Sequence, residues 1–425
     1  MILLIILLFF LLLAIRIPIA FVLGLVSVCY ILMVDLPLVL VAQRSFVQLN
    51  NFIFLAIPCF MLTGALMNAG GMTRRLVKFV QLLLGRVRGS LAVVNIAASM
   101  LFAGITGSAA ADTSAIGGIM IPAMIKDGYS PSESAAITAA SSTIGPIIPP
   151  SILFVVYGVV SGVSIGSLFI AGIIPGLLSG FAMIILVMYF AKKYNWKSKP
   201  AANSLSELFK GAIDAILSLI APVIIIGGIL SGLVTPTEAS VIAVVYAFIC
   251  SAFILKELKL KDLPKIFIDT IILSGSVMLI VAMAGIFGWI LTRERVPLLM
   301  AEAIFSVTTD RTLILIFINL ILLFAGTFLD TNSSTIIFTP ILLPIAVQLG
   351  INPIHFGVIL VFNLCIGLVT PPVGTCLYIA CSIAKIKLEQ LVVAIFPYLI
   401  VLIVVLLVIT YSSGLVMFLP NLLLK

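Results

Sequence analysis

Four polar stretches interrupted by glycine and proline stand out in an otherwise apolar chain, and they carry the residue types that could do chemistry. Glycine permits unwound backbone and proline removes a backbone donor, so such stretches leave carbonyl oxygens free. Free carbonyls together with Ser and Thr hydroxyls form a hard-oxygen ligand set suited to Na⁺. The stretches are Gly104–Ser114, Ser141–Ser151, Gly326–Thr335 and Cys365–Thr375. Cation binding is the first chemistry that they predict.

Two carboxylates, Asp112 and Asp330, lie inside these stretches. Intramembrane carboxylates are costly and are usually functional. An Asp before Thr and Ser or Asn is also good chemistry for capping a helix, and the two roles can coexist. The start of a helix offers backbone N–H groups and a positive dipole end to an anion. We therefore expect an anion site that includes Asp112, Thr113, Ser114, Thr331 and Asn332.

Arg293 ends a long apolar segment in the second half and is a candidate bidentate ligand for a carboxylate substrate. The alternative is a helix-end residue that pairs with Glu294 or reaches toward the membrane surface. Glu238 follows Thr235 at a helix start, where a capping role is expected. His355 is the only histidine and is expected to be structural, because a proton relay would need partners.

The elements that hold these residues must be membrane helices. Of the 425 residues, 63% are apolar and 9% are charged, against roughly 25% charged in soluble domains. The apolar runs 215–234, 239–255, 312–329 and 391–411 have the length of about 20 residues that a helix needs to cross a bilayer. They are continuous rather than alternating, which excludes a transmembrane barrel. Residues 1–15 are expected to form a retained helix and not a cleaved signal peptide.

The net charge of +8 comes mostly from a few short segments. Such clustering is typical of cytoplasmic loops. We therefore expect the chain to contact membrane lipids, and we do not expect a nucleic-acid partner. These segments are Arg74–Arg88, Lys192–Lys210, Lys256–Lys265, and Lys385 with Lys387.

The two halves repeat each other at a fixed offset of 222 residues. Gly104 falls on Gly326, Pro122 on Pro344, Gly145 on Gly367, and Pro149-Pro150 on Pro371-Pro372. The basic segment Arg74–Arg88 falls on Val296–Asp310, which has no Lys or Arg. If basic loops remain cytoplasmic, equivalent loops lie on opposite sides, as in an inverted repeat.

The predicted fold class is an all-α polytopic membrane protein with an inverted-topology repeat and two re-entrant helical hairpins. Only short apolar stretches separate the first polar tip of each half from the next loop, which suits hairpins that enter without crossing. Unwound backbone at membrane depth costs several kcal/mol per unpaired group unless protein, ion or water satisfies it.

The most specific sequences are Phe102–Gly117, Ile147–Ser151, Val234–Glu238 and Val369–Gly374. On these residues the chain resembles, over nearly its whole length, the large membrane (M) subunit of tripartite ATP-independent periplasmic (TRAP) transporters of the dicarboxylate and sialic acid class. The resemblance implies an elevator-type transporter, in which a domain with two hairpins slides against a scaffold.

With the resemblance, the chain divides into five segments. The scaffold is expected to comprise N-terminal helices in 1–50 and central helices with basic cytoplasmic loops in 191–265. The transport domain is expected to comprise repeat 1 with hairpin 1 in 51–190 and repeat 2 with hairpin 2 in 266–390. A C-terminal helix in 391–425 completes the chain.

The resemblance also implies two Na⁺ sites and no organic cofactor. Since Thr106 and Ser108 fall on Phe328 and Asp330 under the offset, the two sites cannot be chemically identical. The first site is expected at Thr106, Ser108, Gly145, Ile148 and Pro150, and the second at Gly326, Asp330, Gly367, Thr370 and Pro372.

The function that the resemblance implies is Na⁺-coupled uptake of a small organic anion across the inner membrane. Its expected partners are a small four-helix membrane subunit, as a separate chain, and a periplasmic substrate-binding protein. Sialic acid, C4-dicarboxylates, keto acids and sugar acids all remain open as substrates. No ATP-binding motif is present, and few titratable groups lie near the polar stretches, which favours a Na⁺ gradient over a H⁺ gradient.

Other functions stay in view. A stand-alone symporter related to the divalent-anion/sodium family would use similar paired hairpins without a soluble partner. A channel would share the broken helices, although their distribution over two halves favours alternating access. An enzyme is not expected, because one His and few acidic groups give no nucleophilic or metal constellation.

Overall fold

The computed structural model describes residues 2–15, 17–196 and 205–424, and all regular secondary structure in these ranges is helical. Seven of the described helices are long and apolar enough to cross a membrane. The four apolar runs predicted from the sequence lie mainly in α11, α12, α15 and α19, each part of a helix long and apolar enough to cross a membrane, so these predictions are confirmed. Arg16 and residues 197–204 of the predicted basic loop lie outside the described residues.

The first half contains ten α-helices and one short 3₁₀ turn among the described residues. They are α1 (Ile2–Ala14), α2 (Ile19–Met33), α3 (Val39–Leu49), η1 (Phe52–Leu55), α4 (Ala56–Ala69), α5 (Met72–Leu84), α6 (Ser90–Thr106), α7 (Ala109–Lys126), α8 (Pro131–Ser142), α9 (Ile152–Ser161) and α10 (Ile165–Lys193).

The second half follows the same plan. Its elements are α11 (Leu205–Leu230), α12 (Pro236–Ile249), η2 (Cys250–Ile254), η3 (Leu260–Asp262), α13 (Leu263–Arg293), α14 (Val296–Val307), α15 (Arg311–Phe328), α16 (Thr331–Gln348), α17 (Pro353–Gly367), α18 (Thr375–Ala384), α19 (Leu388–Tyr411) and α20 (Ser413–Leu423).

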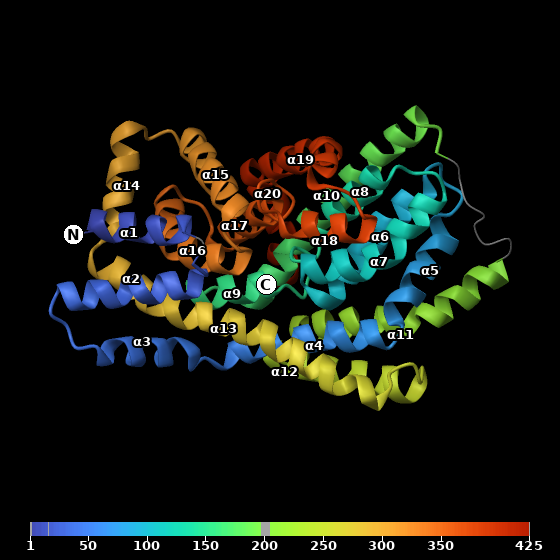
Figure 1. Cartoon of the computed structure of the whole chain (residues 1–425), viewed down its shortest axis with the longest axis horizontal. Helices are drawn as coiled ribbons and strands as arrows, with labels where there is room; N and C mark the ends of the chain where they lie inside the picture. The colour runs from blue at the N-terminus through green and yellow to red at the C-terminus, as the bar shows by residue number, and fades with distance from the viewer. Residues whose placement is uncertain (1, 16, 197–204, 425) are drawn as a thin grey trace.

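The helices repeat with the offset found in the sequence. A shift of 222 residues places both ends of α7 on the ends of α16, and it brings α6, α8 and α9 onto α15, α17 and α18 within three residues at each end. The pairs α6–α7 and α15–α16 lie toward opposite ends of the long axis of the molecule (Figure 1). Equivalent elements therefore occupy opposite ends, although their order is the same and their lengths differ by at most three residues.

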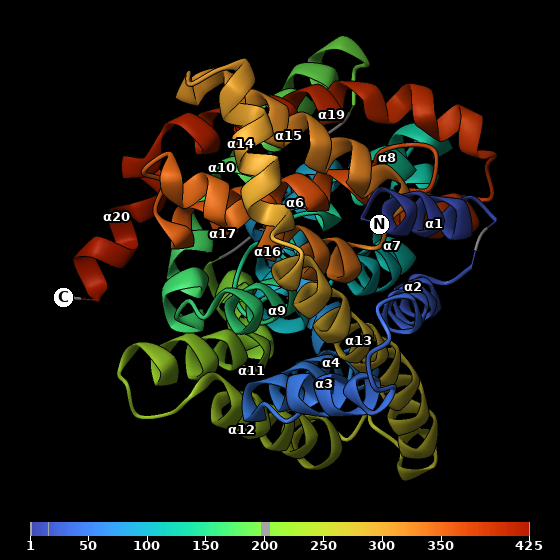
Figure 2. The same ribbon diagram turned by 90° about the vertical axis from the view of Figure 1, so that its left-hand side faces the viewer.

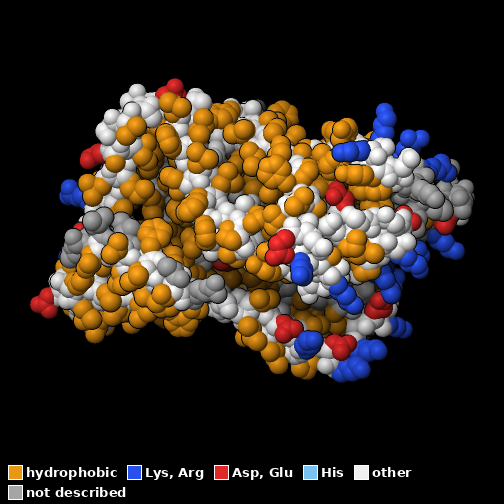
Figure 3. Space-filling model, turned by 45° about the horizontal axis from the view of Figure 1, so that its top comes forward, with side chains coloured by type: hydrophobic (Ala, Val, Ile, Leu, Met, Phe, Trp, Pro, Cys, Tyr) orange, Lys and Arg blue, Asp and Glu red, His pale blue; other side chains and the backbone are white. Residues whose placement is uncertain are grey.

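Charged side chains distinguish the two ends. The α5–α6 turn, the start of α11 and the α12–α13 connection all lie at the right-hand end in Figure 1. Figure 3 shows Lys and Arg gathered at that end, and hydrophobic side chains spread over the rest of this face. The positive-inside rule predicts that this end is the cytoplasmic one.

A separate layer of helices lies beneath the broken ones. Helices α3, α4, α11 and α12 lie together along the lower side in Figure 2, with α15, α17 and α19 above them. The longest helix, α13, packs against α2, α3 and α4 in this layer and also against α16. Helix α13 thus links the supporting layer to the polar tips.

Two smaller predictions are confirmed. Thr235 and Glu238 form a reciprocal capping box at the start of α12, so Glu238 has the capping role expected of it. His355 is buried, and its Nε2 lies 2.8 Å from the carbonyl oxygen of Ile409, which ties α17 to α19. That contact is the structural role expected for the single histidine.

Candidate functional site

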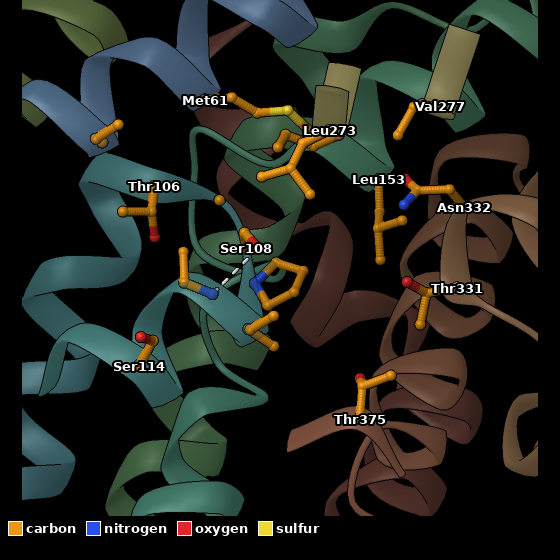
Figure 4. A pocket seen from close by; sticks show the side chains of 18 of the residues that line it. Met61, Thr106, Ser108, Ser114, Leu153, Leu273, Val277, Thr331, Asn332 and Thr375 are labelled. Atoms are coloured by element: carbon orange, nitrogen blue, oxygen red, sulfur yellow. Dashed lines mark hydrogen bonds between the residues drawn. The ribbon is translucent and has the colours of Figure 1, made fainter. Parts of the chain in front are cut away.

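The polar tips of both halves meet at one cavity of about 600 Å³. Its wall combines the α6–α7 and α15–α16 tips, the links before α9 and α18, and one face each of α4 and α13. Figure 4 shows Thr106 and Ser108 on one side of the opening, with Thr331 and Asn332 on the other. Segments more than 200 residues apart in sequence therefore converge here, as the repeat predicts.

At the first tip, the helix breaks at Gly107. Its φ of 60° is in the left-handed region, and an added Cβ would overlap the carbonyl oxygen of Pro150. Only glycine suits that combination. Helix α7 then starts after Ser108, whose Oγ accepts a long hydrogen bond of 3.4 Å from the Ala111 N–H. Both Thr106 and Ser108 line the cavity.

At the second tip, α15 ends at Phe328 and an aspartate caps the next helix. One carboxylate oxygen of Asp330 accepts the N–H groups of Asn332 at 3.0 Å and Ser333 at 3.3 Å. The side chains of Asp330, Thr331 and Asn332 line the cavity. The predicted capping role of Asp330 is therefore present at the cavity wall.

Four helices begin at this cavity. Residues in the first turn of α7, α9, α16 and α18 line it: Ala109, Ile152, Thr331 and Thr375. Ser108, Ser151 and Asp330 cap the starts of α7, α9 and α16, whereas α18 has no side-chain cap, and each start keeps a positive dipole end. No Lys, Arg or His occurs among the described residues of the lining. Any anion in this cavity would thus be held by helix starts, hydroxyls and amides, against the negative charge of Asp269 and Asp330 in the same lining.

Behind the first tip, the 145–150 link presents bare backbone oxygens. In the described part of the chain, the carbonyls of Gly145, Ile148 and Pro150 accept no hydrogen bond. The carbonyl oxygen of Ser108 would lie 3.3 Å from a Cβ placed on Gly145, so it faces this link closely. The Oγ1 of Thr106 is buried without a hydrogen-bond partner. The predicted first ion site is thus brought together in space.

Behind the second tip, two glycines bring backbones into contact. A Cβ on Gly367 would overlap the carbonyl oxygen of Gly326, and one on Gly326 would lie 3.3 Å from the Cα of Gly367. The Thr370 hydroxyl donates to the Ile366 carbonyl at 2.7 Å, and the Pro372 carbonyl accepts from Tyr378 at 3.3 Å. The residues predicted for the second ion site are also neighbours.

The predicted anion ligands of α7 divide into two groups. Ser114 lines the cavity, whereas Asp112 and Thr113 are fully buried and do not. The Thr113 hydroxyl donates to the Ala109 carbonyl at 2.9 Å. Neither carboxylate oxygen of Asp112 has a hydrogen-bond partner, although Ser142 lies close enough to interact with it. Asp112 therefore stands behind the wall rather than in it.

The structure does not bring Arg293 to the other predicted anion ligands. The part of α13 that lines the cavity ends at Ile280. Arg293 follows thirteen residues later, roughly 20 Å along a helix axis. Its exposed guanidinium lies over the Trp289 ring, 5.4 Å from the centroid, beside Glu294, which accepts a hydrogen bond from Tyr30. The surroundings match the helix-end alternative.

Several lining residues were not predicted from the sequence. On α13, Asp269, Leu273, Ser276 and Ile280 line the cavity, and on α4 Asn68 does. The α13 set recurs at intervals of three or four residues, which places it on one helix face. In the sequence, the polar residues Asp269 and Ser276 within an apolar segment indicate this cavity-lining face of α13. They lie outside the repeated polar stretches and were therefore not predicted.

The broken helices around a cavity and the seven apolar spans define a multi-pass membrane protein of the permease type. A family model described as "Tripartite ATP-independent periplasmic transporter, DctM component" matches residues 6–415. The chain belongs to this family and is a multi-pass integral protein of the inner membrane, which confirms the resemblance found in its sequence.

Similar proteins of several bacteria cover most of the chain. The uncharacterized protein YgiK of Salmonella typhimurium is 44% identical, with 97% of this chain and 96% of that protein covered. The isethionate TRAP transporter permease protein DctMQ of Oleidesulfovibrio alaskensis is 42% identical, with 96% and 65% covered. The sialic acid TRAP transporter large permease protein SiaM of Vibrio cholerae is 40% identical, with 90% and 89% covered.

Solved structures share the fold. The YdaH transporter of Alcanivorax borkumensis superposes with a TM-score of 0.64 at 14% identity, over 88% of this chain and 87% of that one. MtrF of Neisseria gonorrhoeae gives 0.63 at 14% identity, over 88% and 84%. At such identities the likeness establishes the architecture alone.

Proposed function

We propose that the chain carries out secondary active uptake of a small organic anion, driven by Na⁺. The observation that carries the proposal is the cavity at which both repeated tips meet, with bare carbonyl oxygens packed directly behind it. Anion-attracting helix starts and cation-attracting carbonyl ends lie back to back there, which is how discontinuous helices serve substrate and coupling ion together.

The lining limits how a substrate can be bound. With no Lys, Arg or His among the described lining residues, a carboxylate or sulfonate would be bound by N–H groups and hydroxyls, and it would share the cavity with the Asp269 and Asp330 carboxylates. The names of similar permeases mention sialic acid, C4-dicarboxylates and isethionate, all of which carry such a group. The supporting residues are Ser114, Thr331, Asn332 and Thr375.

The coupling ion is assigned from the oxygen atoms behind each tip. At the first site, the unpaired Thr106 hydroxyl and the carbonyls of Gly145, Ile148 and Pro150 would bind Na⁺, with Ser108. At the second site, the carbonyl of Gly326 and the Gly367–Pro372 segment would do so, with Asp330 close by. No organic cofactor is required.

The transport cycle that we propose is an elevator. The two hairpins, α6–α7 and α15–α16, would enter from opposite sides without crossing, and would move with α8–α9 and α17–α18. The expected scaffold is the N-terminal segment 1–50 and the central segment 191–265. The packing of α13 against α2, α3 and α4, and also against α16, supports a sliding contact along that helix.

Two protein partners belong to the proposal. The family description is tripartite, which leaves two further components beside the DctM component. The Oleidesulfovibrio alaskensis relative is named DctMQ, and this chain covers 65% of it, which supports a small membrane subunit as one partner. A periplasmic substrate-binding protein would be the other and would deliver the anion.

Uptake into proteoliposomes tests the proposal. Purified chain and small subunit are reconstituted, and labelled sialic acid, C4-dicarboxylates and isethionate are offered with and without an inward Na⁺ gradient and the cognate binding protein. The proposal predicts uptake only when both are present. Na⁺-driven uptake without the binding protein would identify a stand-alone symporter, and uptake indifferent to Na⁺ would refute the ion sites.

A further inference from the structure

A second cavity shares no lining residue with the first cavity, at which the polar tips of both halves meet. It has a volume of about 500 Å³ and lies where the α7–α8 turn, the end of α10 and the start of α19 come together. Helix α10 ends with Lys192 and Lys193, in one of the basic segments assigned to the cytoplasm. The cavity is therefore located near the cytoplasmic membrane surface.

One wall of this cavity is aromatic. Phe190, Tyr194 and Trp196 all line it. The ring centroids of Phe190 and Tyr194 are 5.7 Å apart, and those of Tyr194 and Trp196 are 5.8 Å apart. Tyr129 backs the Trp196 ring at 4.3 Å, which fixes the indole in place. Adjoining aromatic faces attract a cation placed over them.

The cavity lining also offers hydrogen-bond acceptors. One oxygen of the Glu133 carboxylate accepts from the Tyr398 hydroxyl at 2.8 Å, and the carboxylate has no other hydrogen-bond partner among the described residues. Pro397 lies inside α19 and has no N–H, so it leaves the carbonyl of Val393 without its usual donor. Glu133, Val393 and Pro397 all line the cavity.

No Lys, Arg or His occurs among the described residues that line this cavity, so its one charged lining group, Glu133, has no counter-ion within the wall. A carboxylate and an aromatic wall together suit a cation that donates N–H bonds. A primary ammonium group has that chemistry. A bare metal ion suits the site less, because described His, Cys, Asp and Glu residues form no cluster able to hold one.

We propose that this cavity binds the ammonium headgroup of phosphatidylethanolamine. The cavity lies at the end of a membrane span, where Tyr and Trp are at the depth of lipid headgroups. Lys193 lies with its Nζ 5.4 Å from the centroid of the Tyr194 ring, next to the cavity, where it can meet the lipid phosphate. The ammonium binds Glu133, and the phosphate stays outside. This proposal is independent of the transport cycle.

Native mass spectrometry of the purified chain tests the site. The protein is delipidated and then offered equal amounts of phosphatidylethanolamine and phosphatidylglycerol in detergent. We expect wild type to retain phosphatidylethanolamine preferentially. Glu133→Gln keeps the shape and can still accept from Tyr398, and it should retain the lipid at least about tenfold less. Glu389→Gln, an exposed carboxylate outside the cavity lining, is the matched control and should match wild type.

A fluorescence measurement separates a lipid from a free amine. Only two tryptophans are present, so Trp289→Phe leaves Trp196 in the cavity wall as the sole reporter. Nanodiscs with phosphatidylethanolamine should shift its emission relative to phosphatidylglycerol discs, and Glu133→Gln should remove the shift. Equal retention of both lipids, or unchanged retention in Glu133→Gln, would overturn the proposal. A response to soluble phosphoethanolamine but not to the lipid would overturn its lipid source.

Discussion

The two hairpin tips have the same backbone plan but different side chains. Each consists of a helix, a break of two residues and a second helix of 18 residues. In the first tip, Thr106 and Ser108 provide hydroxyls, and in the second Phe328 and Asp330 take their places. The serine cap accepts one bond at 3.4 Å, whereas the aspartate cap accepts two, at 3.0 and 3.3 Å. What the repeat preserves is therefore the two-residue break between the helices.

The two tips also differ in how closely other backbone atoms approach their glycines. The pair Gly326 and Gly367 brings two backbones into direct contact, whereas Gly145 has more room, with the nearest atom 3.1 Å from a would-be Cβ. The proposed second ion site would thus depend more on backbone approach, and the proposed first site more on the Thr106 hydroxyl. The contrast predicts which substitutions will harm which site.

The largest effect is expected for Gly367→Ala. The new methyl group would overlap the Gly326 carbonyl oxygen, a proposed Na⁺ ligand, and would push the two backbones apart. Overpacking of this kind costs about 1–3 kcal/mol, and where that cost falls on the ion-bound state the Na⁺ affinity drops roughly fivefold to 150-fold. Na⁺ activation of uptake in proteoliposomes measures it.

Two other glycine variants complete that test. Gly145→Ala should lose less Na⁺ affinity, because the nearest atom would lie 3.1 Å from the new methyl group. Gly118→Ala in α7 meets nothing within 4 Å and should retain wild-type uptake. Equal losses in Gly367→Ala and Gly118→Ala would show that helix packing in general, and not the ion site, is responsible.

A smaller effect is expected for Asp330→Ala. The variant removes the cap of α16 and a carboxylate beside the second site, and a lost cap alone costs about 0.5–2 kcal/mol. We expect roughly tenfold weaker Na⁺ activation, whereas Ser108→Ala, which removes a longer bond, should lose less. If Ser108→Ala were the more damaging of the two, the proposed difference between the tips would be wrong.

Thr106→Val asks whether the unpaired hydroxyl is an ion ligand. A buried hydroxyl without a protein partner is unfavourable, so its removal alone should be neutral or stabilising. If Na⁺ is its partner, the variant should have roughly threefold to tenfold weaker Na⁺ activation together with unchanged or raised thermal stability in Na⁺-free buffer. The matched control is Thr63→Val, a buried threonine whose hydroxyl bonds to the Cys59 carbonyl at 2.9 Å. Unchanged Na⁺ activation in Thr106→Val would remove this ligand from the site.

The smallest effect is expected for Arg293→Gln. Because Arg293 lies outside the cavity and over Trp289, the apparent KM for the substrate should change less than about twofold. A large rise in KM with kcat unchanged would show that Arg293 binds the substrate after all, and it would mean that α13 lies differently in the substrate-bound protein.

The sequence allowed the helical class, the four polar stretches and their 222-residue repeat to be predicted, because glycine, proline and aspartate landmarks survive in both halves. It could not separate Ser114, which lines the cavity, from Asp112, which is two residues earlier and buried. That distinction depends on how α7 is rotated against its neighbours. The contribution of α13 was also missed, since nothing local to Asp269 reveals which helix face meets the tips.

Direct Na⁺ binding is the measurement closest to the central claim that free carbonyls behind the two tips form ion sites. Purified wild-type chain, Gly367→Ala and Thr106→Val are titrated with ²²Na⁺ in a scintillation proximity assay, with choline replacing Na⁺ to hold ionic strength constant. We predict saturable binding that K⁺ does not displace, with each variant weakening binding. No saturable binding in wild type, or identical curves for all three proteins, would contradict the account.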